Sequence, residues 1–498
     1  MAGLFAALEA ALSLDDQTVA LITGDRHFTR AELLAGSARY ANALADVGVT
    51  TGDRIVAQTE KSVPALLAYL ACLRLGAVYV PLNTAYTAHE VDFFLGDAQP
   101  RVLICDGARR ANLQTFALAQ GVACTLGIDG DDSLATRAAG AAPERHDPAP
   151  PDPAAILYTS GTTGRAKGAM LSQQNLLSNA LTLVDLWGCH SGDVLIHALP
   201  LYHVHGLFVA MHTALLAGAT VQFHERFDAG AVLAALSGAT LFMGVPTYYT
   251  RLLNEAGLTP AACASIRLFI SGSAPLRPET FAAFAARTGH TILERYGMTE
   301  AGMITSNPLH GERIAGTVGR PLPGVTARLA TDDGGVCATG GPGILQIRGP
   351  NVFSGYWRQP DKTATEFTAD GYFITGDVAE IDGDGVVTLT GRAKDLIICG
   401  GLNVYPKEIE LAIDGLPGVE ESAVIGVAHP DFGEVVVAVV TALPGATLVP
   451  DELTKALRVQ LAGFKLPKHV AVVDELPRNA MGKVQKNVLR QRFESLFT

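Results

Sequence analysis

The sequence lacks the features that mark several classes of protein. No run reaches the roughly 18 uncharged apolar residues that a membrane-spanning helix needs. The nearest candidate, residues 206–223, is interrupted by His212 and Gly218, so it is predicted to be a buried helix followed by a strand. The N-terminus has no basic segment and meets Glu9 early, which argues against a secretory signal. These absences predict a cytoplasmic protein.

Cysteine and positive charge are also scarce. There are 7 cysteines, an odd number, and no Cys-x-x-Cys pair, which favours free thiols over a zinc or redox site. The 37 basic residues are outnumbered by 49 acidic ones, which gives a net charge of −12. This balance argues against general binding to nucleic acid or to an anionic membrane. Any anionic ligand therefore needs positive partners gathered locally.

Short apolar runs alternate with helical patterns over most of the chain. The strand-like runs are residues 54–57, 77–81, 102–105, 194–198 and 220–223. Thr29 and Glu32 form a capping box before a helix predicted to reach about Val47. After about Gly391 a smaller α+β pattern begins. Its predicted elements are strands at 422–427, 434–441 and 470–473, with a helix near 451–461. The alternation predicts an α/β fold with parallel strands.

A loop rich in glycine and hydroxyl residues follows the apolar strand at 154–157. It reads Tyr158-Thr-Ser-Gly-Thr-Thr-Gly164 and is followed by Arg165 and Lys167. Small residues let backbone N–H groups approach phosphate oxygens, hydroxyls add donors, and the two cations neutralise charge. The spacing is not that of a Walker A loop. The residues alone predict a phosphate-binding loop, with a surface turn as the alternative.

Six further segments follow this loop in a fixed order. They are Leu199-Pro-Leu-Tyr-His203, Ser271-Gly-Ser-Ala-Pro275, Glu294-Arg-Tyr-Gly-Met-Thr-Glu300, Tyr372-Phe-Ile-Thr-Gly-Asp377, Gly391-Arg-Ala-Lys-Asp395 and Pro477-Arg-Asn-Ala-Met-Gly-Lys483. Together they cover nearly the whole chain and resemble the acyl-adenylate-forming superfamily of acyl-CoA synthetases, adenylation domains and luciferases. The resemblance implies a large N-terminal multi-subdomain α/β domain, residues 1–393, with the ATP and acyl pockets. It also implies a small mobile C-terminal α+β domain, residues 394–498, with the catalytic lysine.

The resemblance implies ATP, Mg²⁺ and coenzyme A as the ligands. Tyr296 is expected to stack on adenine, Asp377 to accept the ribose hydroxyls, and Arg392 to bind ribose or phosphate oxygens. Glu300 and Thr163 are the expected Mg²⁺ ligands. The other predicted ATP- or AMP-binding residues are Thr159, Ser160, Gly161, Thr162, Gly164, Lys167, Gly272, Ser273, Ala274, Glu294, Gly297, Met298 and Thr299. Taken alone, Asp377 fits a turn aspartate equally well, and Glu300 an acid at a helix N-terminus.

By the same resemblance, the C-terminal segments contain the catalytic lysine, the hinge and the coenzyme A loop. Lys483 is the expected catalytic lysine, because a cation is needed where a carboxylate meets the α-phosphate. Lys394 falls at the family's hinge position, and Gly400 and Gly401 are expected to line the pantetheine tunnel. The context of Lys483 also resembles reversibly acylated lysines, which makes a protein lysine acyltransferase an expected partner.

The acyl pocket is predicted from His203, Arg251, Ser271 and Arg295. His203 sits where the family places an aromatic residue or histidine beside the substrate carboxylate, with a structural histidine as the alternative; His205 has no assigned role. Arg295 precedes the adenine tyrosine and offers a bidentate fork to an anionic acyl end. A structural ion pair is the alternative for Arg295, and a surface position for Arg251. The surrounding motifs are similar to malonyl-CoA synthetases in particular, so malonate is the expected substrate and methylmalonate the second.

The predicted function is an AMP-forming acid–CoA ligase, with another short or medium carboxylic acid as the alternative substrate. A module that loads a carrier protein is a second hypothesis, but no Asp-Ser-Leu phosphopantetheine motif follows Lys483. A non-catalytic nucleotide-binding relative is a third. The presence of Lys483, Glu300, Asp377 and Thr163 argues against it.

Overall fold

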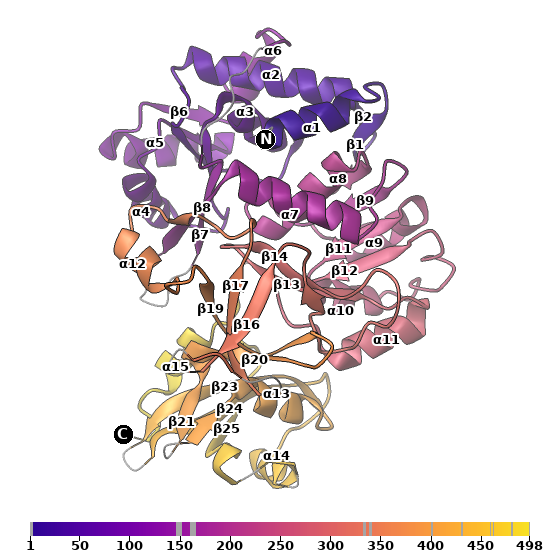
Figure 1. The fold of residues 1–498 in the computed structure, drawn as a ribbon, viewed down its shortest axis with the longest axis vertical. Helices are drawn as coiled ribbons and strands as arrows, with labels where there is room; N and C mark the ends of the chain where they lie inside the picture. The colour runs from indigo at the N-terminus through magenta and orange to yellow at the C-terminus, as the bar shows by residue number, and fades with distance from the viewer. Residues whose placement is uncertain are drawn as a thin grey trace. The chain divides into compact units, whose positions relative to one another are not determined.

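The computed structural model forms two compact units (Figure 1). It describes residues 3–145, 152–159, 166–331, 335–337, 341–399, 402–429, 432–458, 460–461, 463–479 and 482–497. Unit 1 comprises Met1–Thr326 and Ile347–Phe373, and unit 2 comprises Ala327–Gln346 and Ile374–Thr498. The predicted fold class, a large N-terminal α/β part with a smaller C-terminal part, is confirmed. The hinge boundary predicted at 393/394 stays a prediction. In the structure, residues 374–393 belong to unit 2, where strand β20 (Val387–Arg392) packs on helix α13 (Pro406–Asp414).

One sheet of unit 1 has seven strands in the order β18-β8-β7-β4-β3-β5-β6. Their bounds are β3 (Arg54–Gln58), β4 (Val78–Pro81), β5 (Val102–Cys105), β6 (Cys124–Gly127), β7 (Ala155–Thr159), β8 (Lys167–Leu171) and β18 (Gly355–Tyr356). Strands β3 to β7 pair in parallel, and the inner ones are buried along nearly their whole length, as expected between two helical layers. β7 and β8 form an antiparallel hairpin in which Thr159 pairs with Lys167.

The other sheet of unit 1 has nine strands in the order β15-β14-β13-β12-β11-β9-β10-β1-β2. Their bounds are β1 (Val19–Thr23), β2 (Arg26–Thr29), β9 (Val194–His197), β10 (Thr220–Phe223), β11 (Leu241–Gly244), β12 (Leu268–Ser271), β13 (Leu293–Met298), β14 (Gly302–Ser306) and β15 (Arg320–Pro321). β10, β9, β11, β12 and β13 pair in parallel, so their carboxyl ends share one edge. That edge is where α/β folds bind ligands.

Helices cover both sheets of unit 1. α1 (Leu4–Ser13), α2 (Arg30–Asp46), α3 (Val63–Leu75), α6 (Leu134–Ala139), α7 (Gln173–Leu186) and α8 (His212–Leu216) form one group, and α4 (Ala88–Ala98) packs on α5 (Arg110–Ala119). α9 (Ala229–Ala235), α10 (Pro246–Leu253) and α11 (Pro278–Thr288) pack on one another and on the nine-stranded sheet, and α12 spans Pro360–Thr365. The capping box of Thr29 and Glu32 is present at the start of α2, as predicted.

The stretch predicted as a buried helix followed by a strand has that form. It begins with a π-helix, η2 (His205–Met211), continues as α8 and ends in β10. π-Helical turns are rare and often mark functional sites. Through the described part of the chain, none of the helices is both long and apolar enough to cross a bilayer.

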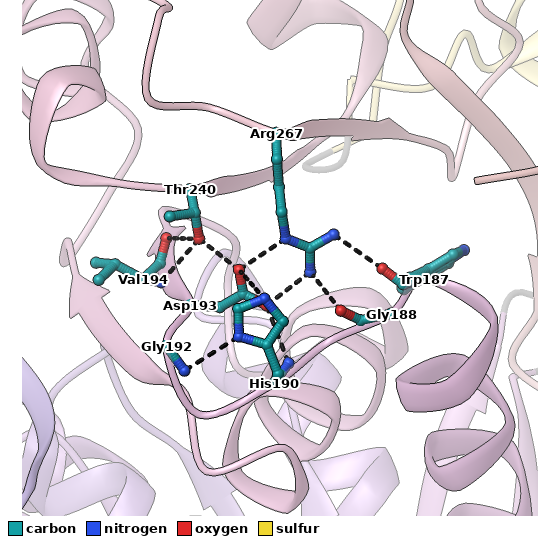
Figure 2. Close-up of polar contacts among 8 residues, drawn as sticks. All are labelled: Trp187, Gly188, His190, Gly192, Asp193, Val194, Thr240 and Arg267. Atoms are coloured by element: carbon teal, nitrogen blue, oxygen red, sulfur yellow. Dashed lines mark hydrogen bonds and ion pairs between the residues drawn. The ribbon is translucent and has the colours of Figure 1, made fainter. Parts of the chain in front are cut away.

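A buried ion pair joins the amino ends of three neighbouring strands of the nine-stranded sheet (Figure 2). Asp193 precedes β9, Thr240 precedes β11, and Arg267 precedes β12. Arg267 Nε and Nη2 lie 2.8 and 2.6 Å from the Asp193 carboxylate, which also accepts from the Thr240 hydroxyl at 2.7 Å. Arg267 donates to the carbonyls of Trp187 and Gly188 at the end of α7 as well. The strand edge opposite the candidate site is therefore held by one charged cluster.

Unit 2 contains two smaller sheets. One has the order β16-β17-β19-β20, and the other β22-β21-β24-β23 with β25 beside β24. The bounds are β16 (Thr326–Ala330), β17 (Gly343–Arg348), β19 (Phe373–Ile381), β20 (Val387–Arg392), β21 (Ile397–Cys399), β22 (Leu402–Val404), β23 (Val419–His429), β24 (Gly433–Ala442), β25 (His469–Val472), α13 (Pro406–Asp414), α14 (Pro450–Leu457) and α15 (Lys486–Phe493). The strands and the helix predicted between 422 and 473 are confirmed, each with small shifts at its ends.

Candidate active site

Arg295 lies in β13 and is almost fully buried, with 2% of its surface exposed. It packs on the backbone of Gly272, where an added Cβ would overlap the guanidinium. Burial lowers the pKa of Arg295 to about 9, although Tyr249 and Glu294 oppose the shift. Its Nε and Nη2 atoms have no hydrogen-bond partner, and no acid in the described residues forms an ion pair with it. The alternative of a structural ion pair is therefore not observed in that part of the chain.

His205 opens the π-helix η2 and is fully buried. Its Nδ1 lies 3.1 Å from the Ser273 hydroxyl, while its Nε2 is buried without a partner in the described structure. Burial, then the charge of Arg295, lowers the pKa of His205 well below its usual range, so the ring is neutral. Sequence reasoning gave this histidine no role. Only the fold reveals that it faces Arg295.

Ser273, the hydroxyl partner of His205, has a strained backbone. Its φ is +73°, a left-handed value that a non-glycine residue rarely adopts. Glu294 also holds this loop, because its Oε1 accepts from the backbone N–H of Leu276 at 3.1 Å. The loop expected to line adenine, from Gly272 to Ala274, is thus fixed in a costly conformation. Such strain often accompanies a ligand contact.

His203 is half-buried just before the π-helix. Its Nδ1 accepts from the backbone N–H of His205 at 3.2 Å, which places the proton of the neutral ring on Nε2. A buried chain supports the same segment from behind. Lys61 donates to Nδ1 of His197, and His197 Nε2 donates to the Gly206 carbonyl at 2.9 Å. The two histidines of this turn are therefore held in defined orientations.

The other two predicted acyl-pocket residues do not share the surroundings of Arg295. In the β12–β13 register Ser271 pairs with Glu294, and alternation of faces along a strand directs Ser271 away from the Arg295 side. α10 presents Tyr249 to the core, whereas Arg251 is exposed. The structure thus does not bring Arg251 beside Arg295, in line with the surface alternative.

Glu300 lies in the turn between β13 and β14 and is buried. It does not begin a helix, so that alternative was wrong. Its Oε1 accepts from the Tyr356 hydroxyl at 3.1 Å.

Lys167, the cation that follows the phosphate loop, is also buried and pairs with Glu366 at 3.0 Å. Sequence reasoning identified neither Tyr356 nor Glu366. Ser160, Gly161, Thr162, Thr163, Gly164 and Arg165 lie outside the described residues.

The described donor set fits Mg²⁺ bound together with a polyphosphate. Mg²⁺ is commonly held by one or two carboxylates, with phosphate and water oxygens completing its shell. Glu300 offers one buried, oriented carboxylate. No cluster of three or more His, Cys, Asp or Glu residues exists among the positions that the structure describes, so a cage built by protein alone is not found there.

The adenine residue Tyr296 is 8% exposed and pairs with Thr305 across the β13–β14 hairpin. Gly297 allows the two strands to approach, because an added Cβ would overlap the Gly302 carbonyl. Met298 and Thr299 follow in the same hairpin and are half-buried. The segment from Glu294 to Glu300 is therefore a strand and turn that carry acyl, adenine and metal candidates in succession.

Unit 2 carries the remaining candidates. Asp377 and Arg392 are cross-strand partners in β19 and β20, and their side chains form an ion pair of 2.8 Å. The backbone of Lys394 lies in a 3₁₀ turn, Ala393–Asp395. Lys483 is exposed in a tight loop, where its N–H donates to the Asn479 side chain at 3.0 Å. Gly400 and Gly401 lie outside the described residues.

Comparison with known proteins identifies the family. The family described as AMP-binding enzyme matches residues 8–357, and its C-terminal domain matches residues 408–483. This chain belongs to the AMP-binding enzyme family. Among solved structures, the ATP-bound MatB from Rhodopseudomonas palustris is 52% identical to this AMP-binding enzyme, with a TM-score of 0.96 over 99% of this chain and 100% of MatB.

Two curated relatives show the range of acids in the family. A malonate–CoA ligase of Arabidopsis thaliana is 34% identical over 90% of this AMP-binding enzyme and 79% of the relative. A feruloyl-CoA synthase of an Amycolatopsis species is 38% identical over 94% of this chain and 95% of the relative. Overall sequence identity to curated relatives therefore does not identify the acid substrate. The residues of the acyl pocket have to distinguish it.

Proposed function

We propose that this AMP-binding enzyme is an ATP-dependent acid–thiol ligase that joins malonate to coenzyme A through a malonyl-adenylate. The observation that carries the substrate is Arg295, a buried guanidinium with two unpartnered nitrogens. A buried cation with unmet donors is unfavourable, and the far carboxylate of a short dicarboxylate would satisfy it. The similarity to a malonate–CoA ligase supports the same acid.

The proposed pocket distinguishes malonate from acids with apolar tails. A feruloyl-CoA synthase is slightly more identical to this chain than the malonate–CoA ligase is. An aromatic tail, however, supplies no carboxylate to form an ion pair with the buried guanidinium. Methylmalonate, which adds one methyl group, is the second candidate. Another short or medium carboxylic acid remains the alternative.

The proposed reaction has two steps. A carboxylate oxygen of malonate bonds to the α-phosphorus of ATP, and the bond to pyrophosphate breaks. The sulfur of coenzyme A then bonds to the acyl carbon, the bond to AMP breaks, and the thiol proton passes to solvent. No covalent intermediate on the protein is needed. Mg²⁺, when bound with ATP, neutralises the charge of the polyphosphate.

Protein groups have separate proposed roles in these steps. The His203 Nε2–H is proposed to hold the reacting carboxylate, and Thr299 to contact the α-phosphate. Tyr296 is proposed to bind adenine, with Asp377 and Arg392 on the ribose. Lys483 is proposed to neutralise the two anions as they meet.

The remaining proposals concern movement, partners and location. Lys394 is proposed as the hinge, and Gly400 and Gly401 as the coenzyme A contacts. The exposed Lys483 is proposed as a target of a lysine acyltransferase. The proposed location is the cytoplasm, in line with the free cysteines of the described chain.

A panel of acids tests the proposed function. Purified protein is incubated with ATP, Mg²⁺ and coenzyme A plus malonate, methylmalonate, acetate, butyrate or ferulate, and thioester is quantified. We expect the highest kcat/KM for malonate. Preference for a monocarboxylate would refute the substrate. ATP–pyrophosphate exchange without thioester formation would instead favour a carrier-loading module, and absence of exchange would favour a non-catalytic relative.

A further inference from the structure

A buried network connects two residues that were assigned separately to the nucleotide. Glu300 Oε1 accepts from the Tyr356 hydroxyl at 3.1 Å, and Glu366 Oε2 lies 3.4 Å from the same hydroxyl. The other oxygen of Glu366 pairs with Lys167 at 3.0 Å and with Lys362 at 2.8 Å. The Lys167 ammonium also lies 4.9 Å from the centre of the Tyr356 ring. All these residues belong to unit 1.

We propose that Tyr356 is a positioning residue for the nucleotide site, whose single hydroxyl proton links the carboxylate of Glu300 to the Glu366–Lys167 ion pair. This proposal rests on the proposed function, because it assumes that Glu300 and Lys167 face the metal and phosphates of ATP. It adds the residue that orients Glu300, beside the carboxylate of Glu366 that holds Lys167.

The chemistry of one hydroxyl between two carboxylates supports the link. A phenol has one proton to donate, so it cannot satisfy both carboxylates fully at once. A phenol carries its proton at neutral pH, so the hydroxyl can donate to either acid. The shorter of the two contacts, 3.1 Å against 3.4 Å, favours Glu300 as the acceptor of this proton. A hydrogen bond to one oxygen orients a carboxylate, as outer partners commonly do for metal ligands.

Glu366 has the complementary task of holding Lys167. The Lys167 side chain is only 8% exposed, so its ammonium depends on a nearby anion. The hydrogen bonds and charges of Lys362 and Lys167 hold the pKa of Glu366 below its usual range against the effect of burial, so the carboxylate stays ionised. Lys362 lies at the exposed end of the network and touches neither Tyr356 nor Glu300 by any hydrogen bond of the described residues.

Equilibrium binding of α,β-methylene-ATP, measured by calorimetry at a series of Mg²⁺ concentrations, tests the proposal without turnover. Tyr356→Phe keeps the ring, which packs 4.8 Å from Phe353, and removes only the hydroxyl. We expect the Mg²⁺ midpoint to rise by roughly ten- to a hundred-fold, the usual effect of losing an outer partner of a metal ligand. KM for malonate and for coenzyme A should not change.

Two further variants separate positioning from a merely structural effect. Glu366→Gln should weaken binding of the analogue at saturating Mg²⁺ roughly tenfold or more while the Mg²⁺ midpoint stays near wild type. Asp361→Asn, at an exposed position of the same helix and outside the network, should change neither quantity. A wild-type midpoint in Tyr356→Phe would overturn the proposal. Equal shifts of the Mg²⁺ midpoint and of the affinity for the analogue in both variants would also overturn it. Thermal unfolding without ligand would identify such shifts as loss of structure. If wild type binds no analogue, the proposed function itself fails and the inference falls with it.

Discussion

At the residue scale, the proposed acyl side of the site is marked by buried atoms that have no partner among the described residues. Arg295 contributes two such nitrogens and His205 one, and both residues are at most 2% exposed. Unmet buried polar atoms are costly, so their occurrence together in a well-packed sheet indicates a polar ligand. The strained backbone of Ser273, next to both, is consistent with the same reading.

Arg295→Ala should lower kcat/KM for malonate by roughly ten- to several-hundred-fold, because one charge-assisted contact contributes about 1.5–3 kcal/mol. Activity toward butyrate should fall far less or rise, since the deletion opens apolar space. Steady-state kinetics with both acids provide the measurement. Arg295→Lys is the matched control. It keeps a positive charge without the planar fork, so its kcat/KM for malonate should lie between those of the wild type and of Arg295→Ala. Equal losses on both acids would make the residue structural.

Buried neutral histidines should make stability fall as the solution is acidified. Burial lowers the pKa of His212 to about 3, and burial and Lys61 lower that of His197 well below its usual value. In the unfolded chain both rings bind a proton near pH 6.5. Below that pH the unfolded state therefore gains protons that the folded state excludes. The free energy of unfolding should then drop by up to about 1.4 kcal/mol per pH unit for each such histidine.

Urea unfolding between pH 5 and 8 measures this slope. His212→Gln retains a partner for the Tyr69 hydroxyl, which lies 2.7 Å from His212 Nε2 in the wild type. The variant should show a shallower loss of stability below pH 6.5. An unchanged slope would mean that His212 does not supply the effect.

The sequence alone proposed roles for some residues and could not reveal others, and the proposed roles stay predictions. Arg295 was predicted from its place beside Tyr296, and its burial fits that role. His205 was left unassigned, since its neighbour Arg295 comes from a strand far away in the chain. Glu366 was missed for the same reason: its partner Lys167 is 199 residues away in the chain. Such pairs are created by the fold, and no local pattern encodes them.

At the scale of elements, the nine-stranded sheet has two differently built edges. Its carboxyl edge leads into η2, the strained Ser273 loop and the segment of Glu300. Its amino edge is held by Asp193 and Arg267. Apolar residues predicted β9 and β10, and the structure buries most of β9 and alternate positions of β10. The π-helical form of η2 was not predicted from the sequence; its second residue, Gly206, packs so closely on the Pro200 carbonyl that an added Cβ would overlap that oxygen.

Arg267→Met should destabilise the protein by about 3–5 kcal/mol, because it leaves the buried Asp193 carboxylate without its guanidinium partner. Burial favours the protonated acid, but hydrogen bonds from Arg267 and Thr240 hold the pKa of Asp193 below its usual value. This stabilisation is present above the unfolded pKa of about 4 and is lost as the pH falls toward the folded one. Chemical denaturation at pH 7 and pH 3.5 measures both effects.

Arg267→Met also tests whether the cluster of Asp193, Thr240 and Arg267 lies apart from Arg295. Arg267 lies at the opposite strand edge from Arg295, so the ratio of kcat/KM for malonate over butyrate should stay unchanged at temperatures where the variant is folded. A change in that ratio would contradict the separation of the two edges.

At the scale of the whole molecule, the candidates divide between the two units. Unit 1 carries Glu300, Tyr296 and Arg295, and unit 2 carries Asp377, Arg392 and Lys483. The sequence predicted a boundary at 393/394 from the change of pattern near Gly391, which would leave Asp377 and Arg392 in the N-terminal domain, and this boundary stays a prediction. It missed that residues 327–346 join unit 2, because their membership depends on pairing with β19.

Lys483→Ala should abolish adenylate formation while sparing thioester formation from supplied malonyl-AMP. Its charge is needed only where the carboxylate meets the α-phosphate. ATP–pyrophosphate exchange measures the first half-reaction, and thioester release from malonyl-AMP and coenzyme A measures the second. Lys486→Met is a suitable control, because Lys486 forms an ion pair with Glu410 within unit 2. Equal loss of both half-reactions would contradict the assigned role.

The charged cluster of Asp193, Thr240 and Arg267 also bears on how such a ligase can diversify. It joins three strands at the ends where no substrate residue lies, so the spacing of those strands does not depend on what their other ends carry. Substitutions that reshape the acid pocket are then buffered against loss of folding. Because stability and acid binding depend on opposite strand ends, relatives with the same fold can differ in the acid that they prefer.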